Sequence, residues 1–243
     1  MQRAIAAVFA HPDDETFAIG GTIARHAGAA RCTLFCATNG DAGRSSGVAV
    51  SSREALGALR ARELAAAARV LGFTSVVAPG YPDGALKSVD ADVLVGDIVA
   101  FLREHRPDIV ITFGPEGAPN THADHRAISR AATAAFHLAG NPASYPETID
   151  RGLAAFAPRR LFYTTWETPA ADAALAMRGL PITARIDVRA QLDANRAAFE
   201  AHGTQHQHRE RFESLALNNE ELYFLAAGVP QPAGVIDDLF AGL

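Results

Sequence analysis

The sequence predicts an α/β fold, because short apolar runs of strand length alternate with longer segments of helical pattern. Such alternation builds a mostly parallel sheet through right-handed crossovers. A chain of 243 residues is also long enough for one large domain with an ample core. We therefore expect a Rossmann-like three-layer sandwich, with helices on both faces of the sheet.

The elements of the first part of the chain alternate strictly. We expect strands at residues 4–10, 31–37, 74–78 and 108–113, and helices at 16–29, 52–71, 90–105 and 122–139. Ser51 and Glu54 have the spacing of a capping box for the second helix, and Gly72 is placed to end it. Cys32 and Cys36 lie about 13 Å apart along the second strand, beyond disulfide reach, so we expect two buried free thiols.

The pattern is looser beyond residue 140. Strands at 160–166 and 182–188 and helices at 189–202 and 209–217 are expected there. We expect a single domain over residues 1–243, in which 1–140 form the parallel core and 141–243 form C-terminal elements that build part of the pocket. Leu239 and Phe240 would suit a contact between subunits, which leaves a homo-oligomer open.

A first candidate site follows the first expected strand, where the chain reads His11-Pro12-Asp13-Asp14-Glu15. Pro12 has a fixed φ and no N–H for the ladder, so the strand ends there. With two carboxylates beside an imidazole, one can bind a cation while the other stays free as a base, as in hydrolytic metal sites. The alternative is that these acids only complement the dipole of the following helix, and this segment alone does not decide.

A second polar cluster, Asn120 to Arg126, follows the expected strand at 108–113. His122 and His125 are three positions apart and share a face of the expected helix, for which Asn120 or Thr121 is a plausible N-cap. We interpret Asp124 as a cap or surface acid, with a hydrogen bond to a ligand histidine as the less favoured alternative.

The carboxyl ends of parallel strands share one edge of the sheet, so the two clusters can meet there. His11, Asp14 and His125 would then form a site of two histidines and one carboxylate with an open position for water. Such a donor set suits a catalytic zinc ion better than a closed structural one.

The two clusters together resemble the PIG-L/LmbE-like family of zinc-dependent de-N-acetylases. This family includes deacetylases of N-acetylglucosaminyl-phosphatidylinositol and of mycothiol and bacillithiol precursors. The resemblance covers most of the chain. Its supporting segments are Asn39–Gly43, Arg60–Glu63, Tyr81–Gly84 and His202–Gln205.

The resemblance implies His11, Asp14 and His125 as zinc ligands, Asp13 as the base on the metal-bound water, and His122 as a group facing the oxyanion. Zinc lowers the pKa of its water toward about 7, which agrees with a carboxylate base. The proton for the leaving amine can come from Asp13 or His122, and the sequence does not separate the two. Another divalent transition metal could take the place of zinc.

The resemblance also implies that Arg60, Asp83, His202 and Gln205 contact the sugar substrate. On the residues alone, Asp83 in Tyr-Pro-Asp-Gly fits an ordinary β-turn, and Arg60 fits an exposed helix charge. The case is weakest for His202 and Gln205, because the histidine-rich stretch around them is typical of a polar surface. A second metal site in that stretch is less favoured.

These observations predict a hydrolase that removes an N-acetyl group from a small N-acetylglucosamine-type glycoside. Two alternatives stay open, an amidase acting on another amide such as a thiol conjugate, and a non-catalytic sugar- or metal-binding protein of the same fold. An unliganded Asp13 argues against the non-catalytic alternative. A dinucleotide-binding domain is not favoured, because Gly20-Gly21 lacks the Gly-x-Gly-x-x-Gly turn after the first strand.

Charge and hydropathy exclude other classes of protein. The formal net charge is −5 and both signs are interspersed, so no nucleic-acid footprint is expected. We find no apolar stretch that could cross a bilayer and no signal peptide, and therefore expect a cytoplasmic protein without a membrane anchor. A soluble glycoside is accordingly favoured over a lipid-linked one.

Overall fold

The computed structural model describes residues 2–117, 121–167 and 179–243, and its centre is a seven-stranded sheet of order β3-β2-β1-β4-β5-β7-β6. The five strands from β3 to β5 run parallel, and β7 runs antiparallel to both β5 and β6. The expected mostly parallel α/β sheet is confirmed. The strands are β1 (Arg3–Phe9), β2 (Ala30–Cys36), β3 (Ser75–Val77), β4 (Ile109–Phe113), β5 (Arg160–Thr165), β6 (Ala184–Asp187) and β7 (Glu220–Gly228).

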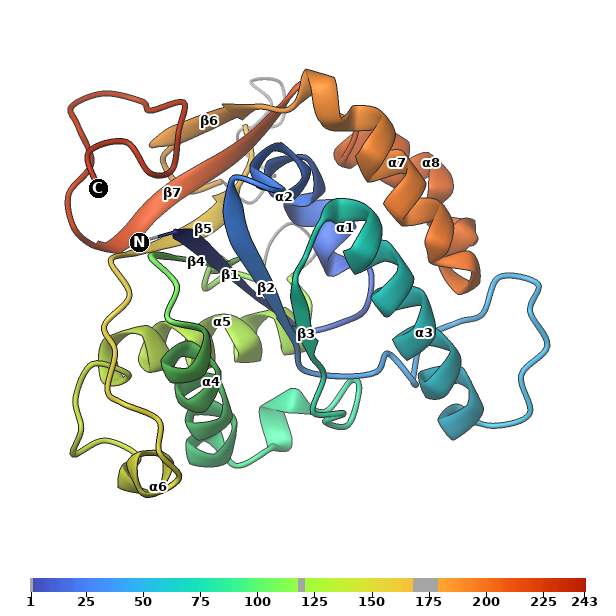
Figure 1. The fold of residues 1–243 in the computed structure, drawn as a ribbon. Helices are drawn as coiled ribbons and strands as arrows, with labels where there is room; N and C mark the ends of the chain where they lie inside the picture. Colours follow the sequence, from blue (N-terminus) through green and yellow to red (C-terminus); the bar gives the residue numbers. More distant parts are fainter. Residues whose placement is uncertain (1, 118–120, 168–178) are drawn as a thin grey trace.

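Helices cover both faces of this sheet (Figure 1). Helices α4 and α5 lie on one face and α1, α2 and α3 on the other, while α7 packs against α2 and α3 from outside. The helices are α1 (Asp14–Ala18), α2 (Gly20–His26), α3 (Arg53–Leu71), α4 (Ala91–His105), α5 (Ala123–Leu138), α6 (Pro146–Asp150), α7 (Leu192–Ala201) and α8 (Arg209–Leu215), with short 3-10 turns at η1 (Leu86–Ser88), η3 (Arg189–Gln191) and η4 (Gly203–His208).

The topological switch point of the sheet lies between β1 and β4. Strand β1 pairs with β2 on one side and with β4 on the other, where Ile5 is opposite Ile109 and Ala7 is opposite Ile111. Both strands are buried almost throughout, as is typical of strands covered on both faces. This register places the segments after Phe9 and Phe113 at the same edge of the sheet, which is where open α/β sheets bind ligands.

The single helix expected at residues 16–29 is instead two helices, α1 and α2, separated at Ile19. At this break the first N–H groups of α2 bond a distant side chain, and the glycine pair packs closely against another segment. A Cβ atom on Gly21 would lie 2.5 Å from Cβ of Val188, so only glycine permits this approach. The carboxylate of Glu221 then accepts the N–H groups of Gly21 and Thr22 at 2.7 and 2.8 Å. Gly20-Gly21 therefore serves close packing of α2.

Other differences concern the ends of elements and the C-terminal segment. Strand β7 was not expected, although Leu222 to Leu225 has strand-forming composition. The N-cap of α3 is Ser52 rather than Ser51, whereas Gly72 ends the helix as expected, with φ of 90°. The predicted subunit contact at Leu239 and Phe240 is wrong, because both side chains are buried in the core of this chain.

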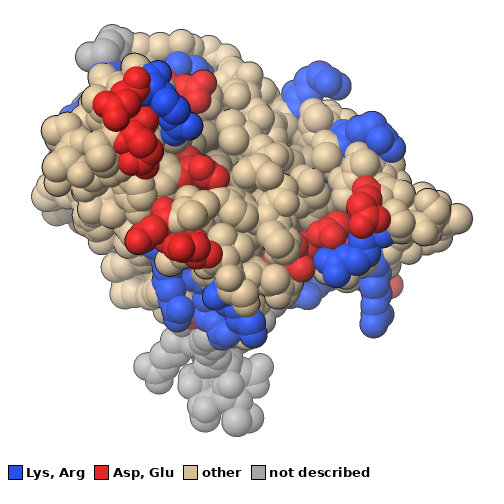
Figure 2. Space-filling model, turned by 90° about the horizontal axis from the view of Figure 1, so that it is seen from below, with Lys and Arg blue, Asp and Glu red and all other residues tan. Residues whose placement is uncertain are grey.

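Cys32 and Cys36 are buried free thiols, as expected. Acidic and basic side chains are interspersed on the face of the molecule shown in Figure 2, without a continuous bank of one sign. Within the part of the chain that the structure describes, none of the helices combines the length and the apolar character needed to span a bilayer.

The packing of α2 leads to a prediction. The substitution Gly21→Ala should lower the free energy of unfolding by about 1–3 kcal/mol, because the added methyl group overlaps Val188. Urea denaturation measures this change. The control is Gly57→Ala in α3, whose Cβ would meet Cβ of Asp41 at 3.2 Å and which gains helix propensity. Equal stability of the two variants would contradict the packing explanation.

Candidate metal centre

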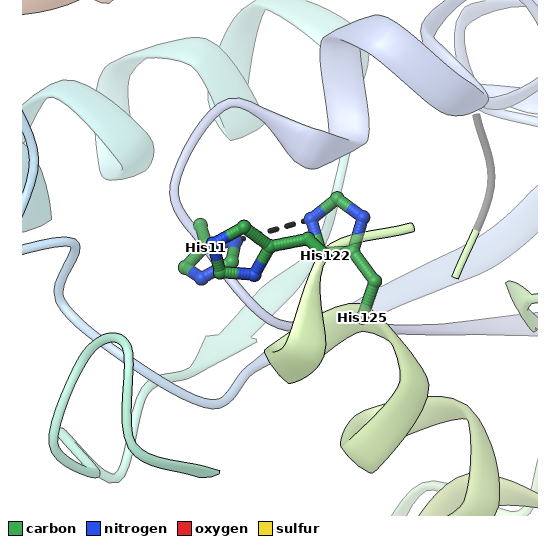
Figure 3. Close-up of side chains that lie close together, drawn as sticks. All are labelled: His11, His122 and His125. Atoms are coloured by element: carbon green, nitrogen blue, oxygen red, sulfur yellow. Dashed lines mark hydrogen bonds between the residues drawn. The ribbon is translucent and has the colours of Figure 1, made fainter. Parts of the chain in front are cut away.

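Donor atoms of three residues from the two polar clusters converge at the edge of the sheet. His11 follows β1, Asp14 begins α1 and His125 lies in the first turn of α5. The Nδ1 atom of His11 lies 3.2 Å from Nε2 of His125 and 3.5 Å from Oδ2 of Asp14, and His125 Nε2 lies 3.2 Å from Oδ1 of Asp14. Figure 3 shows the imidazole of His11, after β1, facing the imidazole of His125, on α5.

These distances fit a tetrahedral metal ion. Ligand atoms about 2.0–2.2 Å from a tetrahedral zinc ion lie roughly 3.3–3.6 Å from one another, close to the separations found here. Two imidazole nitrogens and one carboxylate oxygen also leave a fourth position open. The residues therefore fit a catalytic metal ion, and they are the three that the sequence suggested.

Each of these side chains is held by its surroundings. Oδ2 of Asp14 accepts the backbone N–H groups of Ala10 and His11 at 3.1 and 2.8 Å. Burial alone would raise the pKa of Asp14, but the charges and hydrogen bonds of His125 and His11 lower it strongly, so the carboxyl group is ionised. The ring of His125 stacks on Phe113, with centroids 4.1 Å apart. The donor atoms are thus preorganised.

The other nitrogen of His11 faces two carboxylates, and one of them corrects our interpretation of the sequence. Nε2 of His11 lies 3.2 Å from Asp83 and 3.4 Å from Asp124. Asp124 is not a surface acid but fully buried, and its oxygens also accept the N–H groups of Gly84 and Leu86 at 2.7 and 3.1 Å. A carboxylate at Nε2 keeps the hydrogen there and turns the Nδ1 lone pair toward the metal position.

Negative charge is concentrated around His11. Burial lowers the pKa of this imidazole, but hydrogen bonds to Asp124, Asp14 and Asp83 outweigh burial and raise the pKa well above its ordinary value. A site that favours a positive charge so strongly also favours a bound cation. The described residues offer two other groups with donor spacing, His11 with His122 and His125, and His11 with Asp83 and Asp124. We prefer the set with Asp14, because each pair of its three residues has donor atoms 3.2–3.5 Å apart, with one Asp14 oxygen near His11 and the other near His125.

Asp13 lies beside this set in the wall of the same cavity. Its backbone is left-handed, with φ of 107°, and Oδ2 lies 3.5 Å from Nη2 of Arg60. Burial raises the pKa of Asp13 to about 6, with Arg60 acting against this rise and the Asp14 charge adding to it. Arg60 is itself buried, and its guanidinium donates to the carbonyl groups of Gly40 and Pro12. Arg60 therefore holds Asp13 in place as well as lining the cavity.

His122 stands at the mouth of the site, as the N-cap of α5. The expected caps differ: Thr121 precedes the cap, and Asn120 lies outside the described residues. Nδ1 of His122 accepts the N–H of Asp124 at 3.2 Å, so Nε2 carries the hydrogen in the neutral ring. Burial, together with the charges of His11 and His125, lowers the pKa of His122 and favours that neutral ring. A neutral His122 can still donate a hydrogen bond from Nε2.

Of the remaining expected substrate contacts, two line the cavity and one does not. Asp83 and Gln205 line the cavity. His202 has no exposed surface, does not line the cavity, and lies 2.6 Å from Glu15, so its placement argues against a direct substrate contact. Among the described residues, the groups spaced for a metal ion do not include His206 or His208.

The cavity above the site has a volume of about 1190 Å³, larger than the roughly 300–1,000 Å³ common for small-molecule sites. The individual residues of its outer wall were not identified from the sequence, and they lie after β5, in β6, α8 and β7, and in the loop between α8 and β7. Only tertiary packing assigns these residues to a cavity, and no local motif marks them. They include Trp166, Glu167, Arg185, Arg211, Asn218 and Leu222.

Comparison with known proteins agrees with this geometry. The family model described as "PIG-L: GlcNAc-PI de-N-acetylase" matches residues 6–136, more than half of the chain. A 1D-myo-inositol 2-acetamido-2-deoxy-alpha-D-glucopyranoside deacetylase from Rhodococcus erythropolis is 33% identical over 97% of this chain and 96% of that protein. A probable N-acetyl-alpha-D-glucosaminyl L-malate deacetylase 2 from Bacillus cereus is 37% identical over 54% of this chain and 60% of that protein.

Solved structures share the fold at lower identity. N,N'-diacetylchitobiose deacetylase from Pyrococcus horikoshii has a TM-score of 0.74 at 19% identity, covering 92% of this chain and 83% of that one. The 4-carboxy-2-hydroxymuconate hydratase from Pseudomonas putida KT2440 also has a TM-score of 0.74, at 18% identity, covering 95% and 98%. These two likenesses show the fold alone. The family match and the near full-length relative show the family as well as the fold. They confirm the resemblance suggested by the two motifs: the chain belongs to the PIG-L family of de-N-acetylases.

Proposed function

We propose that this chain is a zinc-dependent hydrolase that removes the N-acetyl group from a small-molecule N-acetylglucosamine glycoside. The observation that carries the proposal is the convergence of His11 Nδ1, the Asp14 carboxylate and His125 Nε2 beside Asp13, in one cavity. The relatives support the choice of substrate, because those named above are deacetylases of N-acetylglucosaminyl compounds. Two histidines with one carboxylate and an open position favour zinc.

The bound metal ion would polarise the acetamide carbonyl and acidify the attacking water. Asp13 takes the proton from that water, since its carboxylate lines the same cavity and is held by Arg60. The Nε2–H of His122 donates to the carbonyl oxygen as negative charge develops on it. The leaving amine takes its proton from Asp13 or from His122.

The size of the cavity supports a glycoside rather than a free sugar. The expected contacts Asp83 and Gln205 line it, and residues from β6 and β7 extend its wall outward. An aglycone has room at that outer end. A cytoplasmic location and assembly into a homo-oligomer stay predictions.

The role of Asp13 can be tested with Asp13→Asn. Asparagine tolerates a left-handed backbone better than most residues, so the turn should persist while the base is lost. We expect turnover of an N-acetylglucosaminide to fall about 10²–10⁴-fold with the metal content unchanged. Amine release and elemental analysis measure the two quantities. Turnover at the wild-type rate would exclude Asp13 as the base.

The metal site can be tested with His125→Ala, which removes one proposed ligand. We expect the zinc content after dialysis to drop sharply and amine release to fall with it, because two ligands hold the ion less tightly than three. The matched control is His137→Ala, an exposed histidine in the last turn of the same helix. Zinc content equal in the variant, the control and the wild type would refute the ligand assignment.

A further inference from the structure

A carboxylate and an imidazole with no exposed surface lie directly behind the proposed base. Oε1 of Glu15 and Nε2 of His202 are 2.6 Å apart, and both side chains are 0% exposed. Neither residue lines the cavity, so neither can touch a substrate held there. Any effect of this pair on the reaction must pass through another residue.

That residue is Asp13, whose conformation needs outside support. With φ of 107° and ψ of −25°, it lies in a region that residues with a Cβ atom rarely adopt. Such a conformation persists only where the surroundings impose it. The Asp13 carbonyl accepts the N–H groups of Thr16 and Phe17 at the start of α1, and the Asp13 N–H donates to Oε2 of Glu15 at 3.0 Å. The backbone of α1 therefore holds the Asp13 carbonyl, and the side chain of Glu15 holds the Asp13 N–H.

His202 in turn fixes Glu15. A buried carboxylate is stable only when its oxygens are paired, and the contacts with Asp13 and His202 occupy one oxygen each. His202 follows α7, so the C-terminal part of the chain reaches the turn that carries the base. The next turn is anchored as well, because Thr204 donates twice to Glu63 of α3, at 2.9 and 2.6 Å.

Helix α3 also carries Arg60, which holds Pro12 and the Asp13 carboxylate. The turn at Pro12 and Asp13 is thus held by Arg60 of α3 directly, and by His202 of the C-terminal segment through Glu15. A contribution to the fold alone would not require the pair to bond the base itself. The hydrogen bond from the Asp13 N–H to Glu15 connects the pair to the residue that acts as the base.

We propose that Glu15 and His202 are positioning residues that hold the backbone of Asp13 in its left-handed conformation and so aim its carboxylate at the attacking water. This inference rests on the proposed function, in which Asp13 is the base. It also assigns His202 a role different from the substrate contact expected from the sequence.

The test compares three variants with the wild type. Glu15→Leu removes the acceptor of the Asp13 N–H, and His202→Phe removes the partner of Glu15 at similar volume. Glu15→Gln keeps an acceptor for Asp13 and a polar group for His202, and serves as the conservative rescue. On an N-acetylglucosaminide we expect kcat to fall at least tenfold in the first two variants, with KM and metal content within about twofold of wild type. Glu15→Gln should retain most of the wild-type kcat.

A second readout does not depend on activity. Amide hydrogen exchange followed by NMR reports the Asp13 N–H directly, and its protection should fall at least tenfold in Glu15→Leu and remain in Glu15→Gln. The matched control is His206→Phe, a half-buried histidine of η4 that contacts Glu200 rather than the site. It should change neither kcat nor the exchange rate.

The outcomes separate the two proposals. If the wild type releases no amine from any N-acetylglucosaminide, the proposed function fails, while Asp13 exchange still decides whether the pair holds the turn. A kcat within twofold of wild type in both Glu15→Leu and His202→Phe overturns the positioning role. So does a loss of activity that only follows lost zinc or lost folded protein, measured by thermal unfolding.

Discussion

The pairing of β1 with β4 is the constraint on which the rest of the molecule depends. This register brings the ends of two buried strands to one edge of the sheet, and the polar clusters that follow the two strands meet there. A shift in this pairing would displace the segment that carries His11 relative to the one that carries His125, whose ring nitrogens now lie 3.2 Å apart. The candidate metal site therefore depends on sheet topology, and side-chain packing sets its final geometry.

The donor residues are surrounded by groups that leave them little freedom. Asp124 binds His11 and also the turn from Gly84 to Leu86, so one buried carboxylate ties α5 to the loop after β3. Arg60 ties α3 to the turn that carries Asp13. Such coupling costs desolvation of several charged groups, which a protein tolerates where a bound cation and a reaction require fixed geometry.

The strands and the residues of the candidate ligand set could be singled out from the sequence, because each depends on local pattern. Apolar runs located β1, β2 and β4 to within one residue, and the motifs after β1 and β4 supplied His11, Asp14 and His125. Asp124 was wrongly interpreted as a surface acid. Helix periodicity indicates which face of α5 carries Asp124, but not that the loop at Gly84 to Leu86 covers that face. His202 and β7 depend on contacts made across almost the whole chain, such as His202 with Glu15 and Glu221 with α2, and no local pattern encodes them.

The fold by itself does not decide the chemistry, since a hydratase and a deacetylase share it with this chain at the same TM-score. The chemistry depends on which side chains bind the metal ion. A crystal structure of the zinc-loaded protein, with anomalous diffraction at the zinc edge, tests them most directly. The account predicts one ion bound jointly by His11 Nδ1, Asp14 and His125 Nε2. An ion bound by His122 in place of Asp14, or no ion between β1 and α5, would contradict it.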